Sequence, residues 1–178
     1  MPESPDRHEP VSRRARRIAV EAVLAALIVA SGRFHVIPSV EWVSVLCLAA
    51  GLLRGVGGGL RVAVAGMLLY SLTSPYGLAS PLVLAAQVLG MAPAGLAGGL
   101  LRRGTPAFWV YGAAGFLTTL WFDLWTNLAT AQYVGALGPS LAAALPFTAV
   151  HVASNVVLFA ALGPLLRSRL SPLFSSAR

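Results

Sequence analysis

Long apolar stretches alternate along the chain with short segments that are charged or rich in glycine and proline. A helix that crosses a bilayer needs about 20 mostly apolar residues. The pattern predicts an all-α protein, an integral membrane bundle of six transmembrane helices. Their expected ranges are roughly 18–31, 40–53, 58–72, 82–101, 107–129 and 145–166. The first three are short for a bilayer, so they would tilt little, thin the bilayer or be protected inside the bundle.

Most arginines lie before the first stretch, in every second connection between stretches, and after the last stretch. Arg33 alone lies in the connections of the other set, where the loops are longer and nearly uncharged. An excess of arginine in short loops marks the cytoplasmic face, so both termini are expected in the cytoplasm. The arginines on that side are Arg13, Arg14, Arg16, Arg17, Arg54, Arg61, Arg102, Arg103, Arg167, Arg169 and Arg178.

The composition agrees with a membrane protein. Hydrophobic residues make up 57% of the chain and charged residues 11%, against about 25% charged residues in a soluble domain. The net charge of +7 does not indicate nucleic acid, because the arginines lie at span ends and not on one polar face. The single cysteine, Cys47, has no partner for a disulfide or a metal site, and no cofactor is expected.

Three regions are expected from this organisation. Residues 1–16 and 168–178 are predicted as cytoplasmic tails, the first of them disordered, around a membrane domain at 17–167. The outer loops, at about 32–39, 73–81 and 130–144, are compact and apolar. Loops of this kind are typical of a lid that covers a cavity. Ordinary linkers, or loops that lie on lipid, would have the same composition.

A few polar side chains interrupt the last three spans. Polar and ionisable groups are costly in a membrane and usually face a cavity or a partner. The rise per residue, counted from the ends of the spans, places these side chains at a similar depth in the outer half of the bilayer. Small-molecule sites are usually built in this way, from a few polar groups that converge in an apolar cavity. Interhelical hydrogen bonds without a ligand are the alternative. The expected substrate-binding residues are Gln87, Asp123, Asn127, His151 and Asn155, with Trp42 and Tyr76 from the outer side.

No catalytic residue is assigned. His151 and Asn155 resemble one helix of the rhomboid intramembrane proteases, but the serine motif and the second histidine of that family are missing. No phosphate-binding Gly-Lys-Ser sequence occurs, and the chain contains no lysine, so it is not expected to hydrolyse ATP.

Ala22, Ala26 and Ala30 recur every four residues along the first span. Small residues allow a second helix to approach closely. The stripe is therefore either a contact inside the bundle or a docking face for another membrane subunit.

Several segments in this order resemble the substrate-binding S component of energy-coupling factor (ECF) vitamin transporters. They are the alanine stripe, Pro38–Trp42 with Ala50–Gly55, and Pro75–Pro81 followed by Gln87–Met91. The resemblance covers about residues 17–166 and implies six helices in the bacterial cytoplasmic membrane. It implies a subunit that captures a micronutrient from outside, then docks through the alanine stripe on a transmembrane coupling subunit with two ATPase subunits.

Two other functions remain open at this stage. One is an intramembrane enzyme that uses Asp123 and His151, and the other is a structural membrane subunit without a ligand. Substrate-binding residues vary widely in the family, so the resemblance does not identify the micronutrient.

Overall fold

The computed structural model describes residues 11–33, 40–75 and 77–175, and the chain is helical throughout these ranges apart from short connections. The helices are α1 (Val11–Ser31), α2 (Val43–Leu72), α3 (Pro81–Leu101), α4 (Phe108–Val134), α5 (Leu137–Leu170) and the short α6 (Pro172–Ser175). Tyr76 and most of the first outer loop, 34–39, lie outside the described residues.

Three of the described helices, α2, α3 and α5, are long and apolar enough to cross a membrane. The all-helical class and the apolar helices that fit a membrane protein agree with the sequence prediction. The structure itself contains no bilayer, so the number of crossings and their direction stay predictions.

Helix α2 is two helical halves joined at a sharp bend. Gly55 has a φ of 72° and a ψ of −176°, a conformation that is cheap for glycine alone. A Cβ atom added at Gly59 would lie 2.6 Å from the Cα of Gly51, although residues eight apart in one straight helix are about 12 Å apart. The chain therefore reverses at Gly55, between two stretches that the sequence predicts as separate spans.

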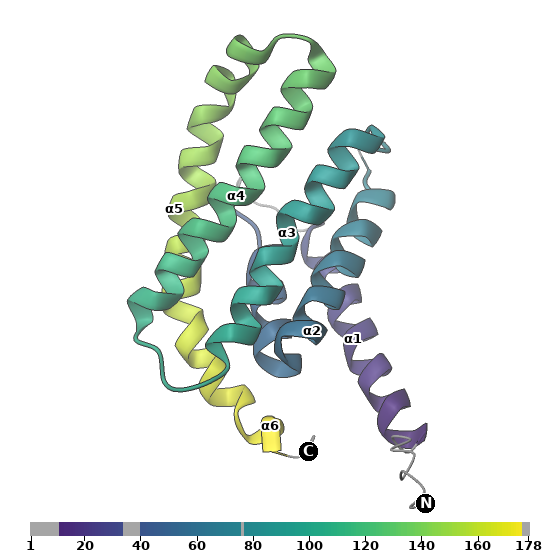
Figure 1. Cartoon of the computed structure of the whole chain (residues 1–178), viewed down its shortest axis with the longest axis vertical. Helices are drawn as coiled ribbons and strands as arrows, with labels where there is room; N and C mark the ends of the chain where they lie inside the picture. The colour runs from purple at the N-terminus through teal and green to yellow at the C-terminus, as the bar shows by residue number, and fades with distance from the viewer. Residues whose placement is uncertain (1–10, 34–39, 76, 176–178) are drawn as a thin grey trace, which may run out of the picture.

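Side-chain contacts fix how the helices run relative to one another. Along α1, Glu21 meets Arg61 and Ile28 meets Gly66, so α1 is parallel to the second half of α2. Tyr111 against Gly163 and Asp123 against His151 make α4 and α5 antiparallel. The start of α1, the bend of α2, the α3–α4 connection and the end of α5 lie toward the same end of the molecule (Figure 1).

The core has two parts. Ile28, Cys47, Val62 and Met91 belong to a cluster that joins α1, both halves of α2 and α3. A second cluster, Val45, Leu48, Leu52, Tyr111 and Phe159, joins the first half of α2 to α4 and α5. The first half of α2 is almost wholly buried by the other helices.

The structure corrects the third outer loop, which the sequence places at 130–144. Helix α4 continues to Val134 and α5 starts at Leu137. Gly135 ends α4 in the left-handed conformation, with its N–H bonded to the carbonyls of Ala131 and Gln132. The α4–α5 hairpin consequently extends beyond the other helices (Figure 1).

The two expected tails are also partly helical. Helix α1 begins at Val11, within the segment expected to be disordered, and α5 continues to Leu170. Residues 1–10 and 176–178 lie outside the described ranges.

Candidate functional site: a buried carboxylate–imidazole pair between α4 and α5

The centre of the site is a contact between two ionisable side chains inside the helical bundle. Asp123 of α4 and His151 of α5 are both buried, with 8% and 7% of their surface exposed. Asp123 Oδ1 lies 2.8 Å from His151 Nδ1, a hydrogen-bonding distance. The antiparallel packing of α4 and α5 brings together two residues that are 28 positions apart in the chain.

Two further polar contacts flank this pair, and together the three form what we call the polar rungs. Asn155 Nδ2 donates to Thr119 Oγ1 over 3.0 Å, and Asn127 Nδ2 donates to Thr148 Oγ1 over 3.1 Å. The α4 members are spaced by four residues, so they share one helix face, and the facing α5 members are spaced by three and four. The structure thus brings four of the expected site residues, Asp123, Asn127, His151 and Asn155, onto one interface.

Sequence reasoning missed both threonines of the polar rungs. Thr119 and Thr148 lie in apolar stretches, where threonine commonly bonds its own helix backbone and carries little signal. Their spacing of four from Asp123 and three from His151 was the available clue.

A third ionisable group approaches the pair from the start of α2. Glu41 Oε1 lies 3.5 Å from His151 Nε2, so the imidazole is between two carboxylates. Phe122 closes another side, with its ring centroid 6.0 Å from that of His151 and the planes at 88°. Glu41 lies in the Pro38–Trp42 segment that resembles the ECF family, but it is not among the site residues expected from the sequence. An acidic residue directly before a buried half-helix is the signal that could have identified it.

Some buried polar atoms of the site have no hydrogen-bond partner among the described residues. They include Asp123 Oδ2, His151 Nε2 and Asn155 Oδ1. Each such atom costs free energy, of order 1–3 kcal/mol, and native proteins keep few of them. The site therefore holds two oxygen acceptors with unused bonding capacity and an imidazole nitrogen whose contact is the 3.5 Å ion pair with Glu41.

The described residues offer no arrangement for a metal ion. No group of three or more histidine, cysteine, aspartate or glutamate residues in these ranges is placed to hold one. The imidazole of His151 lies between the carboxylates of Glu41 and Asp123, so the three groups do not surround a common point where a metal ion could bind.

Gln87 and Trp42 are placed differently from the polar rungs. Gln87 of α3 accepts a 2.9 Å hydrogen bond from Ser71 at the end of α2, and so joins those two helices. Trp42 precedes α2 and is 46% exposed, beside Glu41 in the chain. Tyr76 is outside the described residues. Among the described residues, Asp123, Asn127, His151 and Asn155 therefore lie at one interface, whereas Gln87 lies apart from them between α2 and α3.

Two hollows at the surface lie away from the polar rungs. One is lined by Arg14, Arg17, Ile18, Glu21 and Arg61 at the start of α1. The other is an apolar groove between α3 and α4, lined by Ala97, Leu100, Leu101, Val110, Ala113, Ala114, Leu117 and Thr118.

The alanine stripe lies on the uncovered side of α1. Ala22, Ala26 and Ala30 are all exposed, whereas Ala25 and Ile28 on the opposite side are buried against the core. The stripe is thus not a packing seam within the described part of this chain.

No family model, curated protein or solved structure matches the chain.

Proposed function

We propose that the chain is the membrane-embedded substrate-binding subunit of an ECF-type importer, which captures a micronutrient from outside a bacterial cell. The observation that carries the proposal is the buried carboxylate, imidazole and amide between α4 and α5, with acceptor oxygens on Asp123 and Asn155 that are not used. Buried groups of this kind among apolar helices are typical of small-molecule sites in membrane proteins.

The membrane placement follows from the direction of the helices. Taking the two halves of α2 separately, the segments alternate in direction, which supports six crossings with both termini on one side. The ends that carry the arginines gather on that side, which the positive-inside rule assigns to the cytoplasm. Arg33 is the exception on the outer side, and it donates to the Thr73 carbonyl at the end of α2, where a cation is favourable.

The unused atoms indicate the chemistry of the ligand. Asp123 Oδ2 and Asn155 Oδ1 are acceptors, so they favour a ligand that presents N–H or O–H donors. In this arrangement each polar rung is held by one hydrogen-bonding contact between α4 and α5. Binding would therefore exchange side-chain partners within the rungs for partners on the ligand, with access from the outer end of the hairpin.

The exposed alanine stripe supports the second half of the proposal. Its residues leave a narrow, smooth face on α1 that suits a close helix–helix contact with a coupling subunit. The energy for uptake would come from the two ATPase subunits of such a complex, since this chain contains no lysine for a phosphate-binding loop.

The decisive experiment is the identification of small molecules that the purified protein retains. Mass spectrometry after denaturation of wild type and of Asp123→Asn should show one micronutrient retained by the wild type and depleted in the variant. Thr126→Val is the matched control, because its hydroxyl bonds the Phe122 carbonyl of its own helix over 2.9 Å. A folded wild-type protein that retains nothing, and is not stabilised against heat by any of a panel of vitamins, would favour the structural subunit instead.

An intramembrane enzyme is the alternative with an observation in its favour. The 2.8 Å contact between Asp123 and His151 has the geometry of a carboxylate that orients a catalytic base. A hydrolase would place a nucleophile at Nε2, but that nitrogen faces Glu41, and no hydroxyl or thiol of the described residues bonds to it. Chemical conversion of a ligand that is lost in His151→Gln, with binding retained, would establish the enzyme and overturn a purely binding role.

A further inference from the structure

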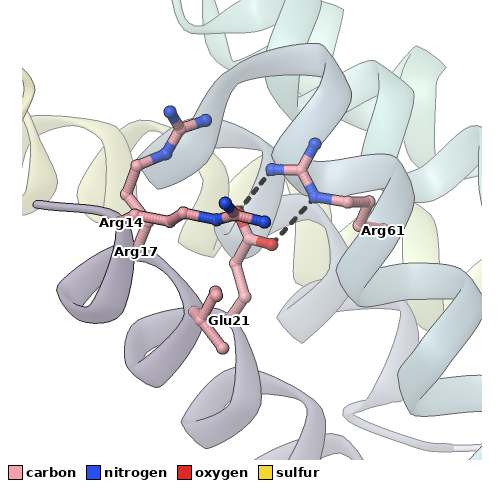
Figure 2. A pocket seen from close by; sticks show the side chains of 5 residues that line it. Arg14, Arg17, Glu21 and Arg61 are labelled. Atoms are coloured by element: carbon pink, nitrogen blue, oxygen red, sulfur yellow. Dashed lines mark hydrogen bonds and ion pairs between the residues drawn. The ribbon is translucent and has the colours of Figure 1, made fainter. Parts of the chain in front are cut away.

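The hollow at the start of α1 is built by one face of that helix and by one residue of α2. Arg14, Arg17, Ile18 and Glu21 follow the three- and four-residue spacing of a single helix face, and Arg61 reaches them from the second half of α2. The side chains of Arg14, Arg17 and Arg61 all line this hollow, with Arg61 and one of the α1 arginines beside the Glu21 carboxylate and the other extending away from it (Figure 2).

Glu21 fixes the α2 side of this hollow. Its Oε2 accepts from Arg61 Nε over 2.9 Å and its Oε1 from Arg61 Nη2 over 2.6 Å, a bidentate pair. Arg54 Nε adds a third contact at 3.4 Å. The side chain of Glu21 is only 15% exposed, whereas that of Arg61 is 55% exposed. The mostly buried carboxylate therefore holds a guanidinium group whose side chain is itself more than half exposed.

Among the residues that the structure describes, those that line the hollow carry more positive than negative charge. Three arginines line it against one glutamate, and that glutamate is shared with Arg54. Arg14 and Arg17 also lie in the first two turns of α1, at the positive end of the helix dipole, and the first turn contains no acidic residue. Like charges gathered in this way favour a bound anion, and the planar guanidinium group matches the oxygens of a phosphate.

The position of the hollow suggests where that phosphate comes from. Ile18, 59% exposed, adjoins the arginines and begins the apolar part of α1. In the membrane placement proposed above, this is the level of the lipid headgroups in the inner leaflet. Basic pockets between helices at that level bind anionic headgroups. We propose that the hollow binds the phosphodiester headgroup of an anionic phospholipid, with Arg14, Arg17 and Arg61 around the phosphate.

The test compares two double variants that remove the same charge from the same helix. Arg14→Gln/Arg17→Gln removes two lining residues. Arg13→Gln/Arg16→Gln removes two exposed arginines that point roughly 90° or more away from the lining face of α1. Both leave the Glu21–Arg61 pair intact, so both proteins should fold. Native mass spectrometry of the detergent-solubilised full chain, titrated with phosphatidylglycerol or phosphatidylcholine, measures the bound lipid.

The wild type should bind phosphatidylglycerol at least about tenfold more tightly than phosphatidylcholine. The lining variant should lose about thirtyfold in affinity, as expected for two charges near an anionic headgroup, and the control variant about threefold or less. Equal losses would mean diffuse attraction and would overturn the site.

Two further results would assign the hollow to another occupant. Displacement of the lipid by millimolar inorganic phosphate, without an effect of the acyl chains, would assign it to a free anion. A lining variant that binds lipid as the wild type does, but no longer co-purifies with a protein partner, would assign it to an acidic protein segment. Either result would overturn the lipid proposal.

Discussion

The α2–α3 pair and the α4–α5 pair are both close helix contacts, but they are made from different groups. Between α2 and α3 the backbones themselves touch, because Gly51, Gly59, Gly95, Gly98 and Gly99 meet without side chains between them. Between α4 and α5, glycines make the contact near the start of α4, and the polar rungs make it nearer the α4–α5 turn. A backbone contact has one geometry, whereas hydrogen-bonded side chains can exchange partners. We therefore expect the α2–α3 contact to be rigid and the half of the α4–α5 hairpin that carries the polar rungs to be adjustable.

The largest effect should come from adding one methyl group to the backbone contact. In Gly51→Ala, the new Cβ would lie 2.6 Å from the backbone nitrogen of Gly99, where real Cβ atoms do not occur. Overpacking of this kind costs about 1–3 kcal/mol, and here only backbone could move to relieve it. We expect a clear fall in the unfolding temperature of the detergent-solubilised protein, or loss of folded protein altogether.

Gly138→Ala is the matched control, since nothing lies within 4 Å of the added Cβ and the residue is inside α5. Alanine is favoured over glycine in a helix by up to about 1 kcal/mol, so this variant should be neutral or slightly more stable. Equal unfolding temperatures for the two variants would show that the glycine contact is not tight.

A smaller effect is expected in the polar rungs. Thr119→Val removes the acceptor of the 3.0 Å bond from Asn155, which is fully buried. Interhelical hydrogen bonds in membranes contribute about 0.6 kcal/mol on average and about 1.7 kcal/mol at most, so the loss of stability should fall within that range. The measurement is a double-mutant cycle of Thr119→Val with Asn155→Leu, followed by thermal or denaturant unfolding.

Thr118→Val is the neighbouring control. Thr118 is also buried, but its hydroxyl donates to the Ala114 carbonyl of its own helix over 2.8 Å. It should show no coupling to Asn155→Leu. Coupling of the same size for both threonines would mean that the rung is not a discrete contact.

The two pairs also differ in how far the sequence predicts them. Apolar length and arginine placement predict helical stretches and even the turn at Gly55, because they depend on local composition. Asp123, Asn127, His151 and Asn155 could be placed on facing helices from spacing alone. The partners of Gly51 or Thr119 could not, because which glycine meets which backbone depends on packing between distant segments. The end of α4 was missed because one left-handed Gly135 stops the helix while the surrounding residues resemble a loop.

The smallest effect on stability should come from α1, on the face that neither pair covers. Ala26 is exposed, so Ala26→Trp should leave the unfolding temperature and ligand retention unchanged. Ala25, its neighbour, is 5% exposed and packs inward, so Ala25→Trp should destabilise or unfold the protein. The same substitution at adjacent positions thus separates the packed face of α1 from the free face.

The proposed docking role predicts a different loss for Ala26→Trp. A bulky residue at the centre of the stripe would hold a partner helix away and remove the close contact that small residues permit. Co-purification with a coupling subunit, and uptake of the micronutrient by cells, should both fail while the isolated protein still binds its ligand. If Ala26→Trp keeps both, the partner docks elsewhere, and α1 is simply a lipid-facing helix that happens to be rich in alanine.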